Sequence, residues 1–372
     1  MSQAMRAVLA WVSVVAACGA ASASRSPRID LTADASLPPS VGLHVERNRL
    51  VDRGAPVRLL GVNHSGTEYA CVKGAGIFEG PDADGLAGAI TAWHANTIRI
   101  PLNEHCWLGL HGLDPRFSGA EYRAAIARFV GDLRARGLYV IIDLHWAAPG
   151  EILADEQLPM ADADYAVDFW KSVAQTFSND TGVLFDLFNE PFLDKVACST
   201  WQGASVDGWD CLRDGCDVTV PDGAITYRTA GTQSLLDAVR ETGAKNVVLI
   251  PGLSYSSDLS RWLERAPRDP LGQIAASLHL YNFSGCHDDE CFSRRFDAIA
   301  KAVPLIAGEI GEDDCKHTFV DGFMQWSDER AGSYLGWAWN TWDCSHGPAL
   351  IERYDGTPTA YGEGLRRHLA RR

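Results

Sequence analysis

The sequence predicts an α/β fold, a single (β/α)8 TIM barrel. Short apolar runs bounded by Pro or Gly alternate along the chain with segments of helical periodicity, and polar or aromatic residues stand at the C-terminal ends of those runs. Such runs are typical of buried parallel strands, and barrel enzymes keep their chemistry at the strands' C-terminal ends. With 372 residues and 46% hydrophobic content, the chain can fill one such barrel, and a second domain would have little room.

The expected elements can be placed in order along the chain. The segment from Gly42 to Ala55, with a turn at Arg53-Gly54, is expected to form a small hairpin that closes the floor of the barrel. Eight barrel strands are expected to begin near Val57, Asn96, Leu138, Val183, Asn246, Ile274, Pro304 and Ser333. Apolar residues recur at helical spacing from Tyr122 to Leu133, and Gly137 follows as a C-cap signal. Further helices are expected near residues 163–177, 224–242, 290–302 and 318–330.

The first 23 residues are expected to be a signal peptide. Arg6 precedes an apolar stretch from Ala7 to Ala17, and small residues lead to a cleavage-like triplet, Ala21-Ser22-Ala23. The stretch is too short to span a bilayer stably. Val15-Ala16-Ala17-Cys18 also resembles a lipoprotein box, in which the signal would end before Cys18 and that residue would carry a lipid anchor.

Both interpretations place the mature protein outside the cytoplasm, either secreted or anchored at the cell envelope. Residues 24–40 are rich in Ser, Ala and Pro and lack apolar periodicity, so we expect a disordered leader. The barrel domain is then expected to occupy residues 41–372.

Nine cysteines beyond Cys18 indicate disulfides, which suit an exported protein. Most follow predicted strands, so the bonds would fasten the loops that shape a cleft. Pairs within one βα loop or between neighbouring loops are expected: Cys71 with Cys106, Cys286 with Cys291, and Cys315 with Cys344. One of Cys198, Cys211 and Cys216 would be left over. No spacing resembles a zinc knuckle, so no metal site is expected.

The longest stretch without regular periodicity runs from Phe192 to about Asp222 and carries Trp201 and Trp209. A loop of that length is unusual unless it has a function. It would follow the fourth strand, so we expect either a disulfide-pinned wall that contacts substrate or an insertion whose tryptophans only hold it together.

Two glutamates close two of the apolar runs. Glu190 follows Leu184-Phe185-Asp186-Leu187-Phe188-Asn189, and Glu309 follows Pro304-Leu305-Ile306-Ala307-Gly308. A single glutamate at a strand end is more often solvated or structural than catalytic. Two carboxylates that face one cleft, however, are the minimum needed to cleave a glycosidic bond, because one donates a proton to the leaving oxygen while the other meets the developing positive carbon.

Other strand ends add to this pair, and together they resemble glycoside hydrolase family 5, the cellulase family of a retaining (β/α)8-barrel clan. The resemblance runs from about Val41 to the C-terminus. Its carriers are Arg99, Asp143-Leu144-His145, Asn189-Glu190-Pro191, His279, Tyr281, Gly308-Glu309-Ile310-Gly311 and a Trp in the eighth strand.

The resemblance implies a role for each of these residues. Glu190 would be the general acid/base, its pKa raised by the charge of Glu309 and by partial burial, and Glu309 would be the nucleophile, held ionised by Arg99. The two carboxyls would then lie about 5 to 5.5 Å apart. The remaining roles fall to Asn189 at the 2-hydroxyl of the sugar, Tyr281 as a donor to Glu309, His279 on the same wall, and His145 beside the sugar and the acid.

Twelve tryptophans offer faces on which sugar rings could stack. Trp337 most resembles the tryptophan beneath the reacting sugar. Trp339 is the second candidate, since two-residue alternation would put it on the same face. Trp146 is a further substrate-binding candidate, as are Trp107 and Trp342, although core packing is the default for each alone.

The net charge of −15 and the pI near 5.1 argue against a nucleic-acid partner. Additional acids stand at strand ends: Glu68, Glu104, Glu312, Asp313 and Asp314. Solvation is the favoured expectation for them, and binding of sugar hydroxyls or of calcium is the alternative. We therefore expect a monomeric, cofactor-free retaining glycosidase that acts on a polysaccharide or oligosaccharide, with no membrane span. An endo-β-1,4-glucanase is favoured. The alternatives are another β-glycosidase (mannan, β-1,3-glucan or exo-acting), a non-catalytic carbohydrate-binding barrel and a metal-dependent barrel hydrolase.

Overall fold

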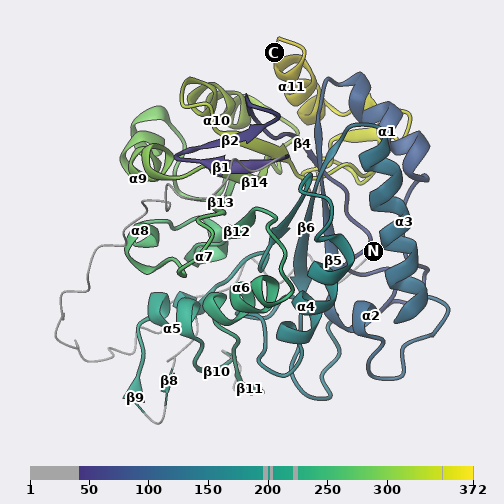
Figure 1. Ribbon diagram of the computed structural model, residues 1–372. Coiled ribbons are helices and arrows are strands. Elements are labelled where there is room, and N and C mark those ends of the chain that lie inside the picture. Colours follow the sequence, from purple (N-terminus) through teal and green to yellow (C-terminus); the bar gives the residue numbers. More distant parts are fainter. Residues whose placement is uncertain (1–41, 196–199, 202–203, 221–224, 346, 372) are drawn as a thin grey trace.

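The computed structural model describes residues 42–195, 200–201, 204–220, 225–345 and 347–371 (Figure 1). The signal peptide, the lipidation site at Cys18 and the leader at 24–40 lie outside the described residues. Among the described residues, no helix has the length and apolar content that crossing a membrane requires.

Eight parallel strands form a closed barrel, which confirms the predicted fold class. Their order around the barrel is β12-β13-β14-β15-β4-β5-β6-β7. Their bounds are β4 (Leu60–Asn63), β5 (Thr97–Asn103), β6 (Tyr139–Trp146), β7 (Val183–Asp186), β12 (Val248–Ile250), β13 (Ile274–Tyr281), β14 (Leu305–Gly311) and β15 (Ser333–Gly336). The first strand begins at Leu60 rather than near Val57, because Val57 ends a strand of the N-terminal sheet.

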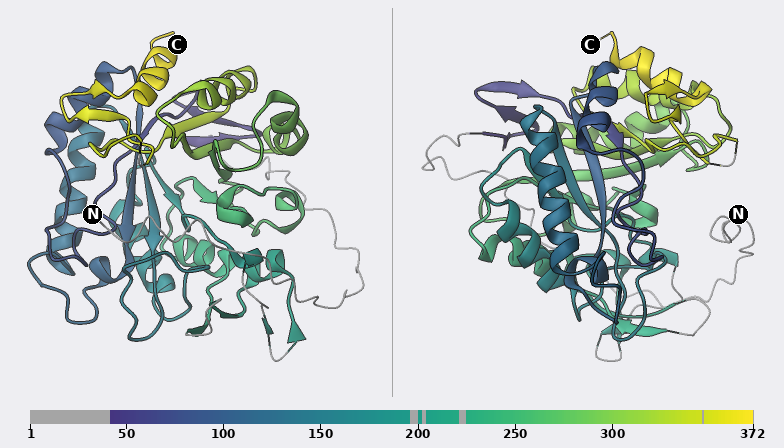
Figure 2. Two further views of the ribbon diagram at one scale, coloured as in Figure 1. Left: turned by 180° about the vertical axis from the view of Figure 1, so that it is seen from behind. Right: turned by 90° about the vertical axis from the view of Figure 1, so that its right-hand side faces the viewer.

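Helices pack around the outside of the barrel (Figures 1 and 2). The longer ones are α1 (Ala83–Ala92), α3 (Ala120–Ala135), α4 (Ala166–Phe177), α6 (Thr232–Glu241), α9 (Asp289–Ala302), α10 (Thr318–Glu329) and α11 (Ala360–Leu369). Helix α9 illustrates why they form. The Asp288 carboxylate caps its first turn by accepting from Cys291 N, and Phe292, Phe296 and Ile299 bury one face at helical spacing. Shorter helices are α2 (Glu104–Leu108), α7 (Leu253–Ser256) and α8 (Trp262–Arg265).

A three-stranded antiparallel sheet closes the floor of the barrel. It contains β1 (His44–Glu46), β2 (Arg49–Asp52) and β3 (Ala55–Val57), one strand more than the expected hairpin. Leu43 and Leu50 pack against the inward-facing residues at the starts of the barrel strands, among them Ile141 and Leu184, in a cluster separate from the main core. Because side chains alternate along a strand, Val140 and Ile142 face outward into the core beneath the helices.

The segment after β7 is more regular than expected. It contains a short 3-10 helix η3 (Leu193–Lys195), strands β8 (Thr200–Trp201), β9 (Ala204–Ser205) and β10 (Asp217–Thr219), and helix α5 (Gly208–Asp214). Strand β10 pairs with β11 (Thr226–Arg228), so helix α6 begins at Thr232 and not near residue 224. The prediction of a long irregular loop was therefore wrong in part. Trp209 is buried within this segment, while the side chain of Trp201 lies outside the described part.

Four disulfides fasten the loops that follow the C-terminal ends of the strands. Cys71–Cys106, Cys286–Cys291 and Cys315–Cys344 confirm the three expected pairs. A fourth bond joins Cys211 to Cys216. The leftover cysteine is Cys198, which lies outside the described residues.

Three of the acids expected in solvent are buried: Glu68 is 3% exposed, Glu104 0% and Glu312 2%. Two of them satisfy backbone groups. Glu68 accepts from Gly66 N at 2.7 Å, and Glu312 accepts from Val320 N, in the first turn of α10, at 2.9 Å. Turn geometry rather than solvation thus determines where these carboxylates lie.

Glu104 is buried against a second acid, Asp162. Glu104 Oε1 and Asp162 Oδ2 have no hydrogen-bond donor among the described residues, and the two side chains contact each other. Burial and the neighbouring Asp162 carboxyl raise the pKa of Glu104 well above its usual value, and burial raises the pKa of Asp162 as well. Burial of two neighbouring acids thus favours the uncharged form of these carboxyls.

Candidate active site

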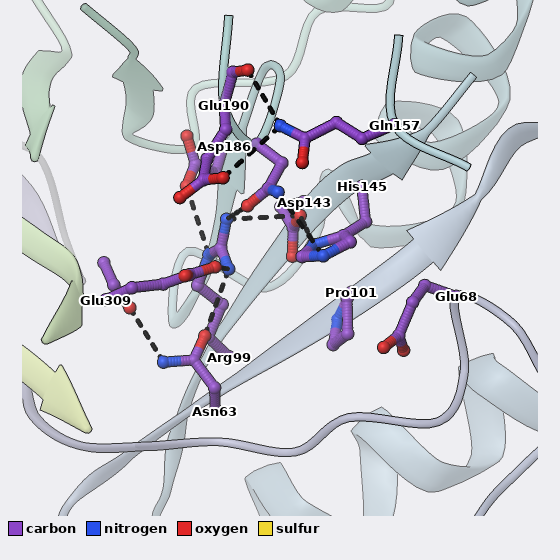
Figure 3. Close-up of polar contacts among 12 residues, drawn as sticks. Asn63, Glu68, Arg99, Pro101, Asp143, His145, Gln157, Asp186, Glu190 and Glu309 are labelled. Carbon is purple, nitrogen blue, oxygen red and sulfur yellow. Dashed lines mark hydrogen bonds and ion pairs between the residues drawn. The ribbon is translucent and has the colours of Figure 1, made fainter. Parts of the chain in front are cut away.

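The inward-facing rows of the barrel change from apolar to polar toward the C-terminal ends of the strands. On β6 the row reads Ile141, Asp143, His145, and on β13 it reads Ala275, Ser277, His279, Tyr281. The first residue of each row belongs to the apolar floor cluster. The remaining residues therefore build a polar layer and, above it, a rim of titratable groups. Figure 3 shows Asp143 and His145 of the β6 row.

Arg99, from the middle of β5, is the centre of the polar layer and is fully buried. Its guanidinium donates to Glu309 Oε1 at 2.8 Å, Asn189 Oδ1 at 2.9 Å, Asn63 Oδ1 at 3.1 Å and Asp186 Oδ2 at 3.2 Å, and it pairs with Asp143 Oδ2 at 3.2 Å. A planar group with five N–H donors can serve this many acceptors at once.

Glu309 faces the cleft because of a β-bulge. Ile306 points inward and Ala307 outward, so strict alternation would turn Glu309 outward as well. The register with β13 shifts at this point: Ala307 pairs with Leu278, but Glu309 pairs with His279. Gly308 is the extra residue, and its carbonyl accepts from Asn63 Nδ2 at 2.8 Å. The bulge thus turns the carboxylate of Glu309 into the barrel mouth.

The Glu309 carboxylate is 3% exposed and has a partner on each oxygen. Arg99 contacts Oε1, as described, and the Tyr281 hydroxyl donates to Oε2 at 2.5 Å. His279 Nδ1 lies 3.6 Å from the same oxygen. The sequence-predicted contacts of Glu309 with Arg99 and Tyr281 are present.

Glu190 lies four residues beyond the end of β7. Asn189 N donates to Leu144 O at 3.1 Å, which keeps this extension against β6. The Glu190 side chain is 16% exposed, contacts His279 Nδ1 through Oε1 at 3.0 Å, and accepts from Gln157 Nε2 through Oε2 at 3.3 Å. Burial raises the pKa of Glu190 to about 7. Of the two expected causes, burial is therefore the largest contribution, and the charge of Glu309 is not among the leading ones.

His145 connects the polar layer to the aromatic floor. Its Nδ1 contacts Asp143 Oδ2 at 2.9 Å, and its Nε2 lies 3.3 Å from Asn189 Nδ2. Burial opposes a charge on this ring, but the Asp143 carboxylate outweighs it and raises the pKa of His145. The ring of Trp337 stacks on His145 with 5.4 Å between centroids and 9° between planes.

The other candidate tryptophans divide into two groups. Trp146 and Trp342 lie at the rim, and both contact the Tyr69 ring, with centroids 6.4 and 6.5 Å away. Trp339 and Trp107 are instead fully buried, and Trp339 packs edge-on against Trp93 at 4.7 Å. The structure therefore places Trp339 in the core and not at the cleft.

Three contributors were missed in the sequence. Asn63 ends the first strand, Asp186 lies within the run that leads to Glu190, and Gln157 stands in the loop between β6 and α4. Asn63 and Asp186 had a usable signal, since each is an inward polar residue at the end of an apolar strand. Gln157 had none, because its contact with Glu190 depends on the path of an irregular loop.

Among the described residues, two groups of side chains bring potential metal ligands within 4.8 Å of one another. One is Cys315, Asp343 and Cys344, but both sulfurs are in a disulfide, so neither is a thiolate. The other is Glu190, His279 and Glu309, whose ligand atoms already pair with one another and with Arg99 and Tyr281. An oxygen of Glu190 and an oxygen of Glu309 therefore lie within 4.8 Å of each other.

Comparison with known proteins gives one family. Residues 51–343 match the family described as Cellulase (glycosyl hydrolase family 5). The chain is 28% identical to Endoglucanase MaCel5A of Microbulbifer sp. (strain ALW1), a match that covers 82% of this chain and 54% of that protein. It is also 28% identical to the "Manganese dependent endoglucanase Eg5A" of Phanerodontia chrysosporium, over 63% of this chain and 57% of that protein. The chain thus spans little more than half the length of these two relatives.

Solved structures with the same fold include the beta-glucanase SdGluc5_26A from Saccharophagus degradans. It superposes with a TM-score of 0.64 and 22% sequence identity, and the match covers 94% of this chain and 98% of that one. At this identity the similarity establishes the shared barrel fold.

Proposed function

Because the chain belongs to glycosyl hydrolase family 5, we propose that it is a retaining β-glycosidase, an endo-acting β-1,4-glucanase with Glu190 and Glu309 as its catalytic pair. The observation that carries this proposal is the spacing of the two carboxylates, whose closest oxygens lie within 4.8 Å of each other. Retaining enzymes hold their carboxyls about 5 to 5.5 Å apart, whereas inverting ones keep about 6.5 to 9.5 Å between them to admit a water.

In the first step Glu190 donates its proton to the glycosidic oxygen while Glu309 attacks the anomeric carbon. The bond to the leaving sugar breaks as an ester between the donor sugar and Glu309 forms. Glu190, raised in pKa by burial, retains a proton near neutral pH, and Arg99 and Tyr281 hold the nucleophile in position. In the second step Glu190 takes a proton from water, which attacks the same carbon and releases Glu309.

The other side chains position the reacting sugar. Asn189 Oδ1 accepts from Arg99, so its amide N–H2 group is oriented toward His145 and the space above the polar layer, where it would reach the sugar's 2-hydroxyl. The Trp337 ring, backed by His145, supplies a flat apolar floor. His279 orients Glu190, and burial, which lowers its pKa to about 3, keeps it neutral so that it can donate to one carboxylate.

The choice of β-1,4-glucan rests on the names of the two relatives, both endoglucanases. Trp146, Tyr69 and Trp342 on one side of the mouth fit an endo-acting enzyme, because they extend the cleft beyond the reacting sugar. We also propose that the enzyme works outside the cytoplasm, since four disulfides suit an oxidising compartment.

A substrate panel tests this function. The purified enzyme should release reducing ends from soluble β-1,4-glucan and lower its viscosity early, as cleavage within chains requires. Activity on mannan or β-1,3-glucan alone would keep the catalytic pair and replace the substrate. A chelator should leave the rate unchanged, because both catalytic groups are carboxylates. Loss of activity that manganese restores would instead favour a metal-dependent mechanism.

The pH dependence of kcat/KM should show an alkaline limb. Glu190 must be protonated to act as the acid, and its pKa is raised to about 7. On β-glucan we expect kcat/KM to be half-maximal near pH 7 and to fall about tenfold per pH unit above it. An aryl glycoside whose leaving group is a strongly acidic phenol needs little proton assistance. Its kcat/KM should therefore fall much less above pH 7. Equal alkaline limbs on both substrates would show that another group controls the profile.

A further inference from the structure

Phe283 is the most exposed of the large hydrophobic side chains in the described part of the chain, at 61%. It lies two residues beyond the end of β13, in the loop that leads to α9. A single exposed apolar residue is ordinary on a protein surface. Phe283 differs because its ring stacks on Tyr281, a side chain that contacts Glu309.

The Phe283 ring stacks on Tyr281, with 5.1 Å between centroids and 10° between planes. A tight turn fixes the backbone beneath it: Ser284 N donates to Tyr281 O at 2.9 Å, and Tyr281 N donates to Ser284 Oγ at 2.9 Å. One face of Phe283 is thus occupied by a side chain that itself contacts Glu309, at 2.5 Å. The rest of the ring remains open to solvent.

Two further restraints hold the loop. Asn282 Nδ2 donates to Asp313 Oδ1 at 2.9 Å, which ties the loop to the one after β14. The Cys286–Cys291 disulfide joins it to the first turn of α9. A side chain with so little freedom loses little conformational entropy when a ligand packs on it.

The position of Phe283 relative to the other aromatic residues gives the direction of the cleft. In an eight-stranded barrel the strand opposite β13 is β5, four places away. Tyr69 follows β4 and Trp146 ends β6, so their ring pair flanks β5. Glu190 follows β7, which is two places from both β13 and β5, and β13 itself supplies His279, which contacts both Glu190 and Glu309. A glycan stretched across the mouth would meet aromatic rings on each side of the catalytic pair.

We propose that Phe283 is the stacking platform for the sugar on the leaving-group side of the cleaved bond, an inference that rests on the proposed function. Glu190, which would protonate the leaving oxygen, contacts His279 of β13 at 3.0 Å, so the leaving-group side of the cleaved bond would lie toward β13. The C–H face of a pyranose can pack on the open edge and face of an aromatic ring. Phe283 would then bind the leaving portion of the substrate and, after it departs, any sugar that takes its place.

Binding a second sugar after the leaving portion departs has a chemical consequence. The ester between the donor sugar and Glu309 can be attacked by water or by a hydroxyl of a sugar bound on the leaving-group side. In the latter case Glu190 takes the proton of that hydroxyl, a new glycosidic bond forms, and the bond to Glu309 breaks. An acceptor platform therefore raises the fraction of the intermediate that is transferred to sugar and not to water.

The test compares transfer of the glycosyl group to a sugar with its transfer to water. An aryl β-cellobioside is supplied with increasing cellobiose, and the ratio of transfer product to hydrolysis product is measured for wild type, Phe283→Ala and Phe283→Trp. The ratio concerns one intermediate, so it does not depend on how much active enzyme is present. We expect Phe283→Ala to lower it about tenfold, from the energy of one aromatic contact, and Phe283→Trp to keep or raise it. On soluble β-glucan, kcat/KM should also fall about tenfold in Phe283→Ala.

Two controls make the result specific. Ile152→Ala shortens another exposed apolar side chain, 36% exposed in the loop after β6, and should leave the ratio and the β-glucan kcat/KM at wild-type values. Trp342→Ala, on the opposite side, should lower kcat/KM on β-glucan without lowering the ratio. An unchanged ratio in Phe283→Ala, with an active enzyme, overturns the inference and leaves the proposed function intact. A wild type that cleaves no aryl β-glycoside overturns both.

Discussion

Glu309→Gln is expected to lower kcat on β-glucan by about four orders of magnitude or more, because the uncharged amide cannot form the ester with the donor sugar. Gln is nearly isosteric with Glu, so Arg99 and Tyr281 keep a partner of similar shape and the fold should persist. Glu190→Gln should cost roughly a hundred- to ten-thousandfold on the same substrate, the range of general acid–base assistance. Both variants are measured by initial rates, with circular dichroism as a check of folding.

Azide separates the two roles. In Glu309→Gly, azide can enter the space of the missing side chain and attack the anomeric carbon once, so an activated aryl β-glycoside should give the α-glycosyl azide. In Glu190→Gly the intermediate still forms with such a substrate, and azide replaces water in the second step to give the β-glycosyl azide. Exchanged products would reverse the assignment of acid and nucleophile. Rates close to wild type in both variants would place the catalytic site elsewhere.

Arg99→Met is expected to destabilise the fold by roughly 3 to 5 kcal/mol, the usual cost of removing one partner from a buried ion pair. Asp143, Asp186 and Glu309 would lose their shared counter-charge in a layer closed to solvent. Since a domain of this kind is stable by about 5 to 15 kcal/mol in total, the loss is severe. Arg99→Lys should recover only part of it, because an ammonium group cannot serve five acceptors at once. Urea unfolding followed by tryptophan fluorescence measures both.

Arg116→Met is the matched control for this loss. Arg116 also pairs with a carboxylate, that of Asp114, but its side chain is 75% exposed. Exposed pairs contribute little, so we expect the midpoint of urea unfolding to stay close to that of the wild type. Equal effects of Arg99→Met and Arg116→Met would mean that the buried network does not stabilise the fold.

The sequence was sufficient for the barrel because its signals are local. Each barrel strand is recognisable as an apolar run, and the inward position of the polar side chain at its C-terminal end follows from two-residue alternation. Alternation failed where the chain leaves the strand: β15 ends at Gly336, so Trp337 and Trp339 need not share a face, and only Trp337 reaches the cleft. The bulge at Gly308, which turns Glu309 inward, was equally hidden, because it depends on the register with a neighbouring strand.

Other features depend on contacts between distant segments, and periodicity cannot reveal them. Gln157 meets Glu190 across 33 positions of sequence, and Arg99 meets Glu309 across 210. The family resemblance predicts the contact of Arg99 with Glu309 but not the contact of Gln157 with Glu190. Similarly, β10 and β11 each have only three residues, too few for alternation to predict a strand, and they are recognised by their pairing with each other.

The buried pair of Glu104 and Asp162 has a thermodynamic consequence. A carboxyl whose pKa is raised by folding binds a proton that the unfolded chain has already released, so folding near neutral pH takes up protons from solution. The contribution of the pair is greatest below the pKa of a free carboxyl and is lost as pH rises toward the folded-state pKa, by about 1.4 kcal/mol per pH unit for each proton. Raising the pH toward that pKa therefore weakens the fold at a site that takes no part in the proposed chemistry.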